Sequence, residues 1–197
     1  MKRIIIGLTG ASGSILAYTA VKKLLDNGHE VHFVASDLGQ RVMAYELERS
    51  YSEILIEFGS YRNFVHHEND NMFASIASGS YSSDAMCIIP CSMGTLGKIS
   101  GGIADNLLCR AADVMLKEHR PLVLVTRETP LSGIHLENMV KLSRYGATIM
   151  PPVPAFYNKP KSLEDMIQHT VARILRALGI TLDEHVTWSG LEDSSHE

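Results

Sequence analysis

The stretch Arg3–Ser14, RIIIGLTGASGS, decides the fold of this chain. Its apolar run is interrupted by Gly7 and Gly10, too early for the hydrophobic segment of a signal peptide. We therefore predict a buried strand over Arg3–Thr9, followed by a turn of small residues. Apolar residues at helical spacing come next, namely Leu16, Ala17, Ala20, Val21 and Leu24. A buried strand, a small-residue turn and a helix are the opening unit of many α/β proteins.

Four further apolar, β-branched segments repeat this pattern along the chain. They predict strands over His29–Ala35, Ala85–Pro90, Pro121–Thr126 and Ala147–Met150. Strands that are apolar throughout and separated by helices form a parallel sheet covered on both faces. Ser162 and Asp165 mark the start of the last helix, and Gly179 marks its end. The sequence thus predicts an α/β fold with an open, mostly parallel sheet sandwiched by helices, in one domain over residues 1–180 with a polar tail over 181–197.

The composition narrows the class of protein. Of 197 residues, 45% are hydrophobic and 20% are charged, with a net charge of −4, which is typical of an ordinary globular protein. No basic field is available for a polyanion, so we expect no nucleic-acid partner. No apolar run reaches the roughly 20 residues of a transmembrane helix. The three cysteines (Cys87, Cys91 and Cys109) fit neither a disulfide framework nor a zinc motif, which indicates the reducing cytoplasm.

The candidate site follows from where the strands end, because open parallel sheets bind ligands beyond those carboxyl ends. Gly10–Ser14 precedes a helix whose N–H groups could hold an anion, although it matches no P-loop, dinucleotide or nucleophile-elbow motif. A tight turn without a ligand is the alternative. Ser36-Asp37 is a weak NAD signal. Pro90–Leu96 is a second candidate anion cradle, in which Cys91 is either a nucleophile or a small buried residue.

Charged residues follow the next strand and the helix before it. Arg127-Glu128 ends a buried strand and is either a solvated loop or a site. Arg110 and Lys117, seven residues apart, share one helix face. The stiff Pro151–Tyr157 loop presents a phenol. Two small-residue cradles together with these cations indicate an α/β protein that binds phosphate-bearing ligands.

One segment lacks clear periodicity. Glu57–Ser83 is polar and predicts a long excursion, which in a compact domain is often functional. Its His66-His67 pair is interpreted as a solvated loop rather than a metal site, because no further ligand lies at a fixed spacing.

Taken together, the motifs resemble the UbiX/Pad family of flavin prenyltransferases. The resemblance covers nearly the whole chain, through Gly10–Gly13, Pro90–Leu96, Arg110–Val114, Leu116–Glu118, Arg120–Leu124, Arg127–Leu131, His135–Met139, Pro151–Tyr157 and the last helix. The bacterial branch known as a component of phenolic acid or vanillate decarboxylases is the most similar. The resemblance implies a flavodoxin/Rossmann-like three-layer sandwich and a homododecamer with FMN sites at subunit interfaces.

The implied reaction joins the dimethylallyl group of dimethylallyl phosphate to N5 and C6 of reduced FMN. The prenylated FMN then serves a UbiD-type decarboxylase. No D-D-x-x-D magnesium motif occurs, consistent with a metal-independent reaction on a monophosphate. The donor could equally be the diphosphate, although the missing motif favours the monophosphate.

The resemblance also implies the roles of individual residues. The implied FMN contacts are Gly10, Ala11, Ser12, Ser36, Ser92, Met93, Gly94, Thr95 and Arg127. The implied contacts of dimethylallyl phosphate are Arg110, Lys117, Arg127, Glu128, Tyr157 and Arg173. The implied catalytic residues are Ser12, Glu46 and Glu128. Fixed cations stabilise the departing phosphate, Glu128 or that phosphate removes the C6 proton, and Glu46 relays protons with Ser12. Trp188 matches a tail aromatic that covers the site.

Two other functions stay open at this point. An FMN-dependent decarboxylase of the cysteine-peptide type shares the sandwich, but it relies on a histidine in its first helix region. This chain has Tyr18 and Thr19 there, and no histidine before Gly28. A flavin carrier or accessory subunit without catalysis is the second alternative.

Overall fold

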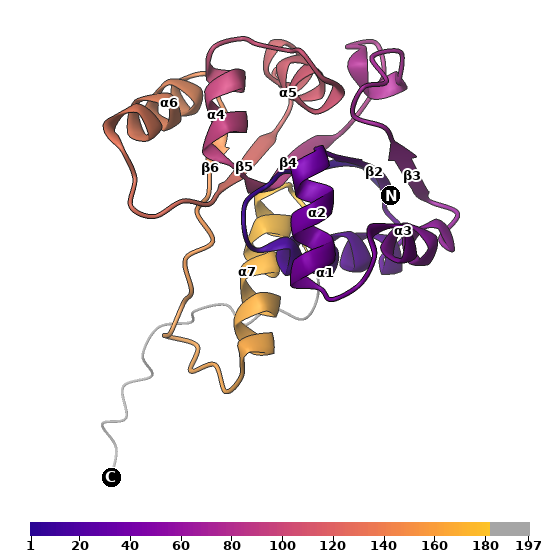
Figure 1. Ribbon diagram of the computed structural model, residues 1–197, viewed down its shortest axis with the longest axis vertical. Coiled ribbons are helices and arrows are strands. Elements are labelled where there is room, and N and C mark those ends of the chain that lie inside the picture. Colours follow the sequence, from indigo (N-terminus) through magenta and orange to yellow (C-terminus); the bar gives the residue numbers. More distant parts are fainter. Residues whose placement is uncertain (182–197) are drawn as a thin grey trace.

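The computed structural model describes residues 1–181, which form a parallel sheet between two layers of helices (Figure 1). The elements are, in chain order, β1 (Arg3–Leu8), α1 (Ser14–Asp26), β2 (Glu30–Ala35), α2 (Asp37–Glu46), α3 (Tyr51–Gly59), β3 (Phe64–His67), the short 3-10 helix η1 (Ser75–Ala77), β4 (Ala85–Cys91), α4 (Met93–Ser100), α5 (Leu107–Lys117), β5 (Leu122–Thr126), α6 (Gly133–Arg144), β6 (Thr148–Ile149) and α7 (Leu163–Ala177). The predicted strands are confirmed to within about two residues at each end, as is usual for element boundaries.

The strand order is β3-β2-β1-β4-β5-β6, and every neighbouring pair is parallel. From β1 the chain first moves outward through β2 and β3, and then crosses to β4 and proceeds in the other direction. The carboxyl ends of β1 and β4 therefore flank the point where the winding reverses, which is where open α/β sheets bind ligands. The predicted α/β sandwich is confirmed.

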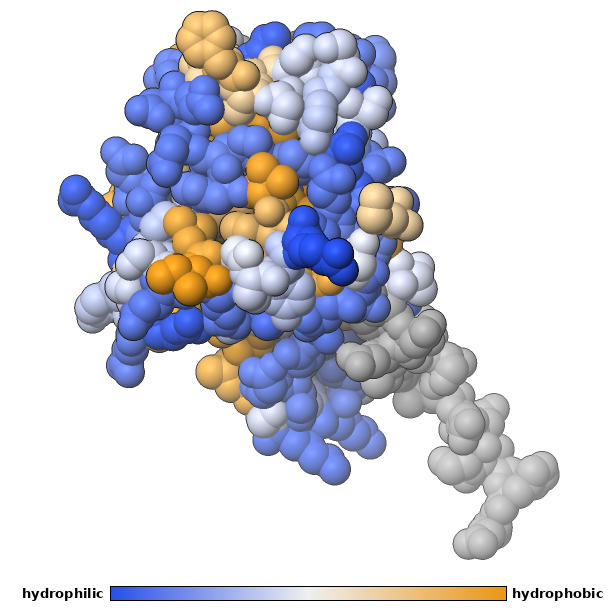
Figure 2. Space-filling model, turned by 90° about the vertical axis from the view of Figure 1, so that its right-hand side faces the viewer, coloured by the Kyte–Doolittle hydropathy of each residue, from blue (hydrophilic) through white to orange (hydrophobic). Residues whose placement is uncertain are grey.

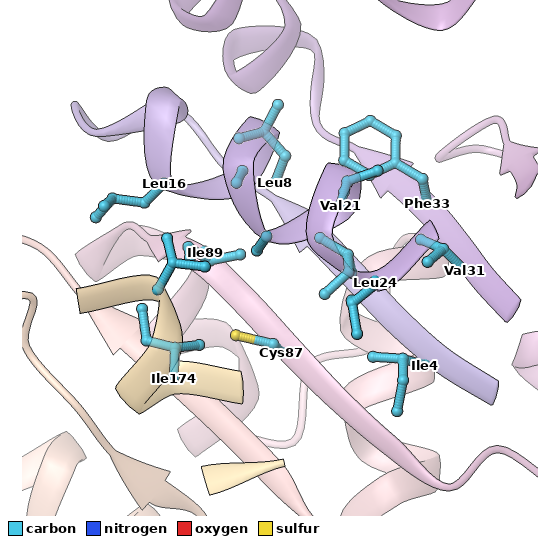
Figure 3. Close-up of a cluster of buried hydrophobic side chains, with 14 of the residues drawn as sticks. Ile4, Leu8, Leu16, Val21, Leu24, Val31, Phe33, Cys87, Ile89 and Ile174 are labelled. Atoms are coloured by element: carbon cyan, nitrogen blue, oxygen red, sulfur yellow. The ribbon is translucent and has the colours of Figure 1, made fainter. Parts of the chain in front are cut away.

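Two hydrophobic clusters hold the layers together, one on each face of the sheet. Because successive side chains of a strand point to opposite faces, Ile4 and Leu8 of β1 pack with α1 and α7, as Figure 3 shows. Ile5 lies in the other cluster, among residues of α4, α5 and α6. Burying each such side chain stabilises the fold by about 1.5–3 kcal/mol. The sheet is consequently a rigid base for the loops at its carboxyl edge.

The last helix begins and ends where its sequence predicts. Ser162 Oγ accepts a hydrogen bond from Asp165 N (3.1 Å), and Asp165 Oδ2 accepts one from Ser162 N (3.1 Å), which completes a capping box. Gly179 has a φ of 72°, the left-handed conformation that favours glycine after a helix. Ser162 thereby sets the start of the helix that carries Arg173.

The segment Glu57–Ser83 differs from its prediction, because it contains an edge strand and a 3-10 helix. The His66-His67 pair belongs to β3 and is not a solvated loop. His67 Nε2 lies 2.8 Å from Nδ1 of the buried His32 on β2. Burial is the main cause that lowers the pKa of His67, to about 4. Two adjacent histidines conceal the strand pattern, because the partner that buries one of them is remote in sequence.

The surface and the tail complete the description. On the face shown in Figure 2, hydrophobic side chains form separate patches among hydrophilic ones. Within residues 1–181, no helix is long and apolar enough to cross a membrane. Trp188 and nearly all of the predicted tail lie outside the described residues.

Candidate functional site

Three helices begin beside one another at the carboxyl edge of the sheet. α1, α2 and α4 follow β1, β2 and β4, and these strands are neighbours. Their N-cap residues are Gly13, Ser36 and Ser92. The first N–H groups of a helix lack partners within the helix and attract anions. The three turns that the sequence selected are therefore brought together at the reversal point of the sheet.

The start of α1 is occupied by a carboxylate of the chain itself. Glu46, the last residue of α2, accepts hydrogen bonds from Gly13 N (3.0 Å to Oε2) and Ser14 N (2.7 Å). Burial would raise the pKa of Glu46, but hydrogen bonds from Ser12, Ser14 and Gly13 outweigh burial and lower it. The sequence predicts that these N–H groups are open to an anionic ligand. That prediction is wrong for Gly13 and Ser14, because a side chain of α2 takes this place.

Gly10 is required by the packing of α2. A Cβ atom at this position would overlap the side chain of Leu38, in the first turn of α2. Ser36 begins that helix, and its Oγ accepts a hydrogen bond from Gly39 N at 3.1 Å. The glycine turn after β1 thus allows α2 to begin close to it, whether or not a ligand is bound.

Thr9 joins the ends of β1 and β4. Its Oγ1 donates to Pro90 O (2.7 Å) and accepts from Ser92 N (2.8 Å), and the residue is 1% exposed. Ser92 Oγ in turn donates to Thr95 Oγ1 (3.1 Å) and accepts from Thr95 N (3.3 Å). Thr9 is not among the site residues predicted from the sequence. Its signal is a hydroxyl at the end of a buried strand, next to the glycine turn.

The start of α4 offers room and donors for a ligand. A Cβ atom added at Gly94 would meet nothing within 4 Å. Ser92 caps Thr95 N, which leaves earlier N–H groups of the helix for a ligand. Hydroxyls and N–H groups at a helix start are suitable donors for a phosphate or for the polar edge of a flavin. The residues present therefore fit FMN at this helix.

Cys91 is a core residue rather than a nucleophile. It is fully buried, and burial raises the pKa of its thiol. A buried thiol with a raised pKa is poorly reactive. Among the described residues, no group of three or more His, Cys, Asp or Glu side chains is placed to hold a metal ion.

Tyr157 and Arg173 meet beyond β6. Tyr157 Oη lies 3.3 Å from His169 Nε2, and His169 precedes Arg173 by one helical turn on α7. His169 and Arg173 line a cavity of about 230 Å³, together with Met150–Val153 after β6. Because β6 is the neighbour of β5, this cavity lies on the same edge as Arg127.

Arg127 and Glu128 are exposed at the end of β5. The Glu128 carboxylate accepts a hydrogen bond from Thr129 N at 2.9 Å. Neither side chain packs into the core, so both are available to a ligand.

Lys117 lies at the opposite edge of the sheet. It ends α5, just before β5 begins, whereas Arg127 follows the end of β5. Five strand residues separate these edges by about 16 Å. Arg110, which was also predicted to lie nearby, is on the same helix as Lys117 and pairs with Asp113 (2.7 Å). The prediction of one local group of four cations is therefore wrong for a single copy of the chain.

Comparison with known proteins identifies the family. A family model described as "Flavoprotein" matches residues 1–175. The flavin prenyltransferase LpdB of Lactiplantibacillus plantarum is 47% identical over 191 residues, which cover 96% of this chain and all of that protein. The chain belongs to the UbiX family of flavin prenyltransferases. The resemblance inferred from the motifs is confirmed.

Solved structures of UbiX proteins agree with this assignment. The crystal structure of AnUbiX (PadA1) in complex with FMN and dimethylallyl pyrophosphate is 42% identical, with a TM-score of 0.91, and the match covers 97% of this chain and 99% of that chain. A dodecameric FMN-dependent UbiX-like decarboxylase from Escherichia coli O157:H7 is 43% identical, with a TM-score of 0.87, and the match covers 95% and 100% of the two chains. The peptidyl-cysteine decarboxylase EpiD matches at 16% identity and a TM-score of 0.62, which shows a shared fold alone.

Proposed function

We propose that this UbiX-family flavin prenyltransferase joins the dimethylallyl group of dimethylallyl phosphate to N5 and C6 of reduced FMN. The observation that supports the proposal most directly is the meeting of three helix starts at the reversal point of the sheet, with space beside Gly94. Prenylated FMN is then the product, and a UbiD-type decarboxylase is its recipient. FMN supplies the nucleophilic ring atoms, and the chain supplies binding, charge and proton transfer.

FMN is held, on this proposal, by the turns after β1, β2 and β4. The contributing residues are Gly10, Ala11, Ser12, Ser36, Ser92, Met93, Gly94 and Thr95, with Arg127 from the end of β5. Ser36 and Ser92 place hydroxyls at helix starts, where negative groups are favoured. Because Glu46 already occupies the start of α1, we assign the anionic part of FMN to the other two helices.

The donor phosphate is bound by cations from two copies of the chain. Arg127, Tyr157 and Arg173 lie at the carboxyl edge of the sheet in one copy. Lys117 and Arg110 reach that edge from a neighbouring copy, because about 16 Å of strand separates the two edges within one chain. The E. coli relative is dodecameric, and a homododecamer provides such neighbours. These cations stabilise the charge that develops on the leaving phosphate, as magnesium does in other prenyltransferases, and we propose that no metal is needed.

Two carboxylates manage the protons. Glu128 is exposed beside Arg127 and is free to remove the C6 proton, a role that the released phosphate can share. Glu46 has a lowered pKa and stays ionised near neutral pH, where it accepts a hydrogen bond from Ser12. It can therefore orient the Ser12 hydroxyl for proton relay.

Anaerobic incubation of the protein with reduced FMN and dimethylallyl phosphate tests the proposal. The product mass should exceed that of FMN by one C5 unit, before and after treatment of the protein with a metal chelator. A flavin carrier would retain FMN without this gain, and a cysteine-peptide decarboxylase would instead release carbon dioxide from a peptide. A parallel reaction with the diphosphate identifies the preferred donor.

Two variants test the assigned roles. Glu128→Gln and Lys117→Ala should each reduce turnover by about a hundredfold or more while FMN binding is retained. Glu137→Ala is the matched control, because Glu137 is exposed on α6 and has no hydrogen bond or ion pair within residues 1–181. Normal turnover in either test variant would remove that residue from the mechanism.

A further inference from the structure

Lys117 is held in place by two features of its own chain. Its ammonium pairs with the neighbouring Glu118 carboxylate. Both groups lie against Gly79, in the loop that precedes β4. A Cβ atom added at Gly79 would lie 2.6 Å from Lys117 Nζ and would overlap Glu118 Oε1. The absence of a side chain at Gly79 therefore permits this arrangement.

The loop that carries Gly79 is fixed by two arginines. Arg120 donates hydrogen bonds to the carbonyl oxygens of Gly79 and Tyr81, each at 2.7 Å. Arg110 Nε donates to Ala77 O at 3.0 Å. Three carbonyl groups within five residues thus receive charged donors, which make stronger hydrogen bonds than neutral ones.

The Tyr81 side chain anchors the same loop to the sheet. Its hydroxyl lies 2.9 Å from Nε2 of the buried His32, and the Arg3 guanidinium lies 4.4 Å from the centre of its ring. Glu30 links His32 and Arg3 through contacts of 2.7 Å to each. An added atom at Gly79 will consequently displace the flexible ends of Lys117 and Glu118 rather than the loop.

We propose that Gly79 and Glu118 are positioning residues that aim the Lys117 ammonium at the phosphate of the prenyl donor. The proposal rests on the function proposed above, in which Lys117 binds that phosphate. An ammonium has three N–H donors, so one can bind Glu118 while the others face a phosphate. The Lys117 and Glu118 side chains are 45% and 34% exposed. An exposed ion pair contributes little to stability, so a role in folding does not account for the pair.

Three variants test the proposal by steady-state kinetics with reduced FMN. Gly79→Ala preserves every charge, and the φ of Gly79 lies outside the left-handed region, so alanine adds no backbone strain. We expect Gly79→Ala and Glu118→Ala each to raise KM for dimethylallyl phosphate roughly tenfold to a hundredfold, the effect of misplacing one charged hydrogen bond. Glu118→Gln keeps an acceptor oxygen and should recover most of the loss. FMN affinity, measured by quenching of flavin fluorescence, should stay within about twofold of the wild type.

The control is Gly59→Ala, at the end of α3, where a Cβ atom would meet nothing within 4 Å. It should leave KM unchanged. If Gly79→Ala and Glu118→Ala keep the wild-type KM, or if Glu118→Gln is as impaired as Glu118→Ala, the positioning role is refuted. A wild-type protein that adds no C5 unit to FMN would refute the proposed function instead, so the two failures are distinguishable.

Discussion

Glu46 is expected to stabilise the fold as well as take part in the reaction. Helix α1 begins at Gly13 without a side-chain cap and has no acidic residue in its first turn. Glu46 supplies the missing carboxylate from α2, through contacts of 3.0 Å with Gly13 N and 2.7 Å with Ser14 N. Replacement of Glu46 by alanine therefore leaves two N–H groups without their partner and removes a favourable charge from the helix start.

The magnitude follows from these contacts. Each hydrogen bond to a charged group contributes about 1.5–3 kcal/mol, and the helix dipole adds about 0.3–1 kcal/mol. Water can replace part of this, because Glu46 is only half-buried. We expect Glu46→Ala to lower the free energy of unfolding by about 2–4 kcal/mol and Glu46→Gln by about 1–2 kcal/mol. For a chain of this length, a change of 1 kcal/mol corresponds to about 2–4 °C in Tm.

Thermal unfolding followed by circular dichroism is a suitable assay, at one protein concentration because assembly makes Tm depend on concentration. Glu137→Ala, which removes an exposed carboxylate with no ion pair in the described part of the chain, is the control. The folded pKa of Glu46 is lowered, so its contribution is fully present above the unfolded value of about 4.3 and is lost as pH falls through the folded pKa. A Tm for Glu46→Ala equal to that of the control near neutral pH would refute this reasoning.

Three further predictions concern the same edge of the sheet and its histidines. Ser92→Ala should lower the free energy of unfolding by about 1 kcal/mol, and Ser92→Gly by less, because Ser92 caps α4; chemical denaturation measures both. Gly10→Ala should weaken FMN binding about tenfold, measured by fluorescence quenching, because the new Cβ atom displaces Leu38 and the start of α2. The pKa of His67 is lowered to about 4, so the unfolded chain binds more protons below about pH 6.5 and stability falls from there toward the folded value. His67→Gln should flatten that part of a stability–pH profile, and an unchanged slope would contradict the assignment.

The fold was predictable because its signals are local. Buried parallel strands are continuous apolar runs, and Arg3–Thr9 or Pro121–Thr126 needs no knowledge of its neighbours to be found. The capping box at Ser162 is contained within four residues. β3 was missed because its two histidines depend on His32, more than thirty residues earlier, for burial.

The site was predictable in its parts and not in its arrangement. Small-residue turns after strands indicate helix starts, and these were found. That Glu46 reaches the start of α1 depends on how α2 packs, which no local pattern encodes. Lys117 and Arg127 were grouped because both are cations near one strand, but sequence distance does not reveal that they lie at its two ends.

This division of cations has a genetic consequence. If one copy contributes Lys117 and its neighbour contributes Arg173, a site spoiled by the loss of either residue can be restored by mixing. Co-assembly of a Lys117→Ala chain with an Arg173→Ala chain would then create some junctions with both cations intact. Two inactive alleles would complement each other in one cell, and the fraction of activity regained would count the junctions of the right kind.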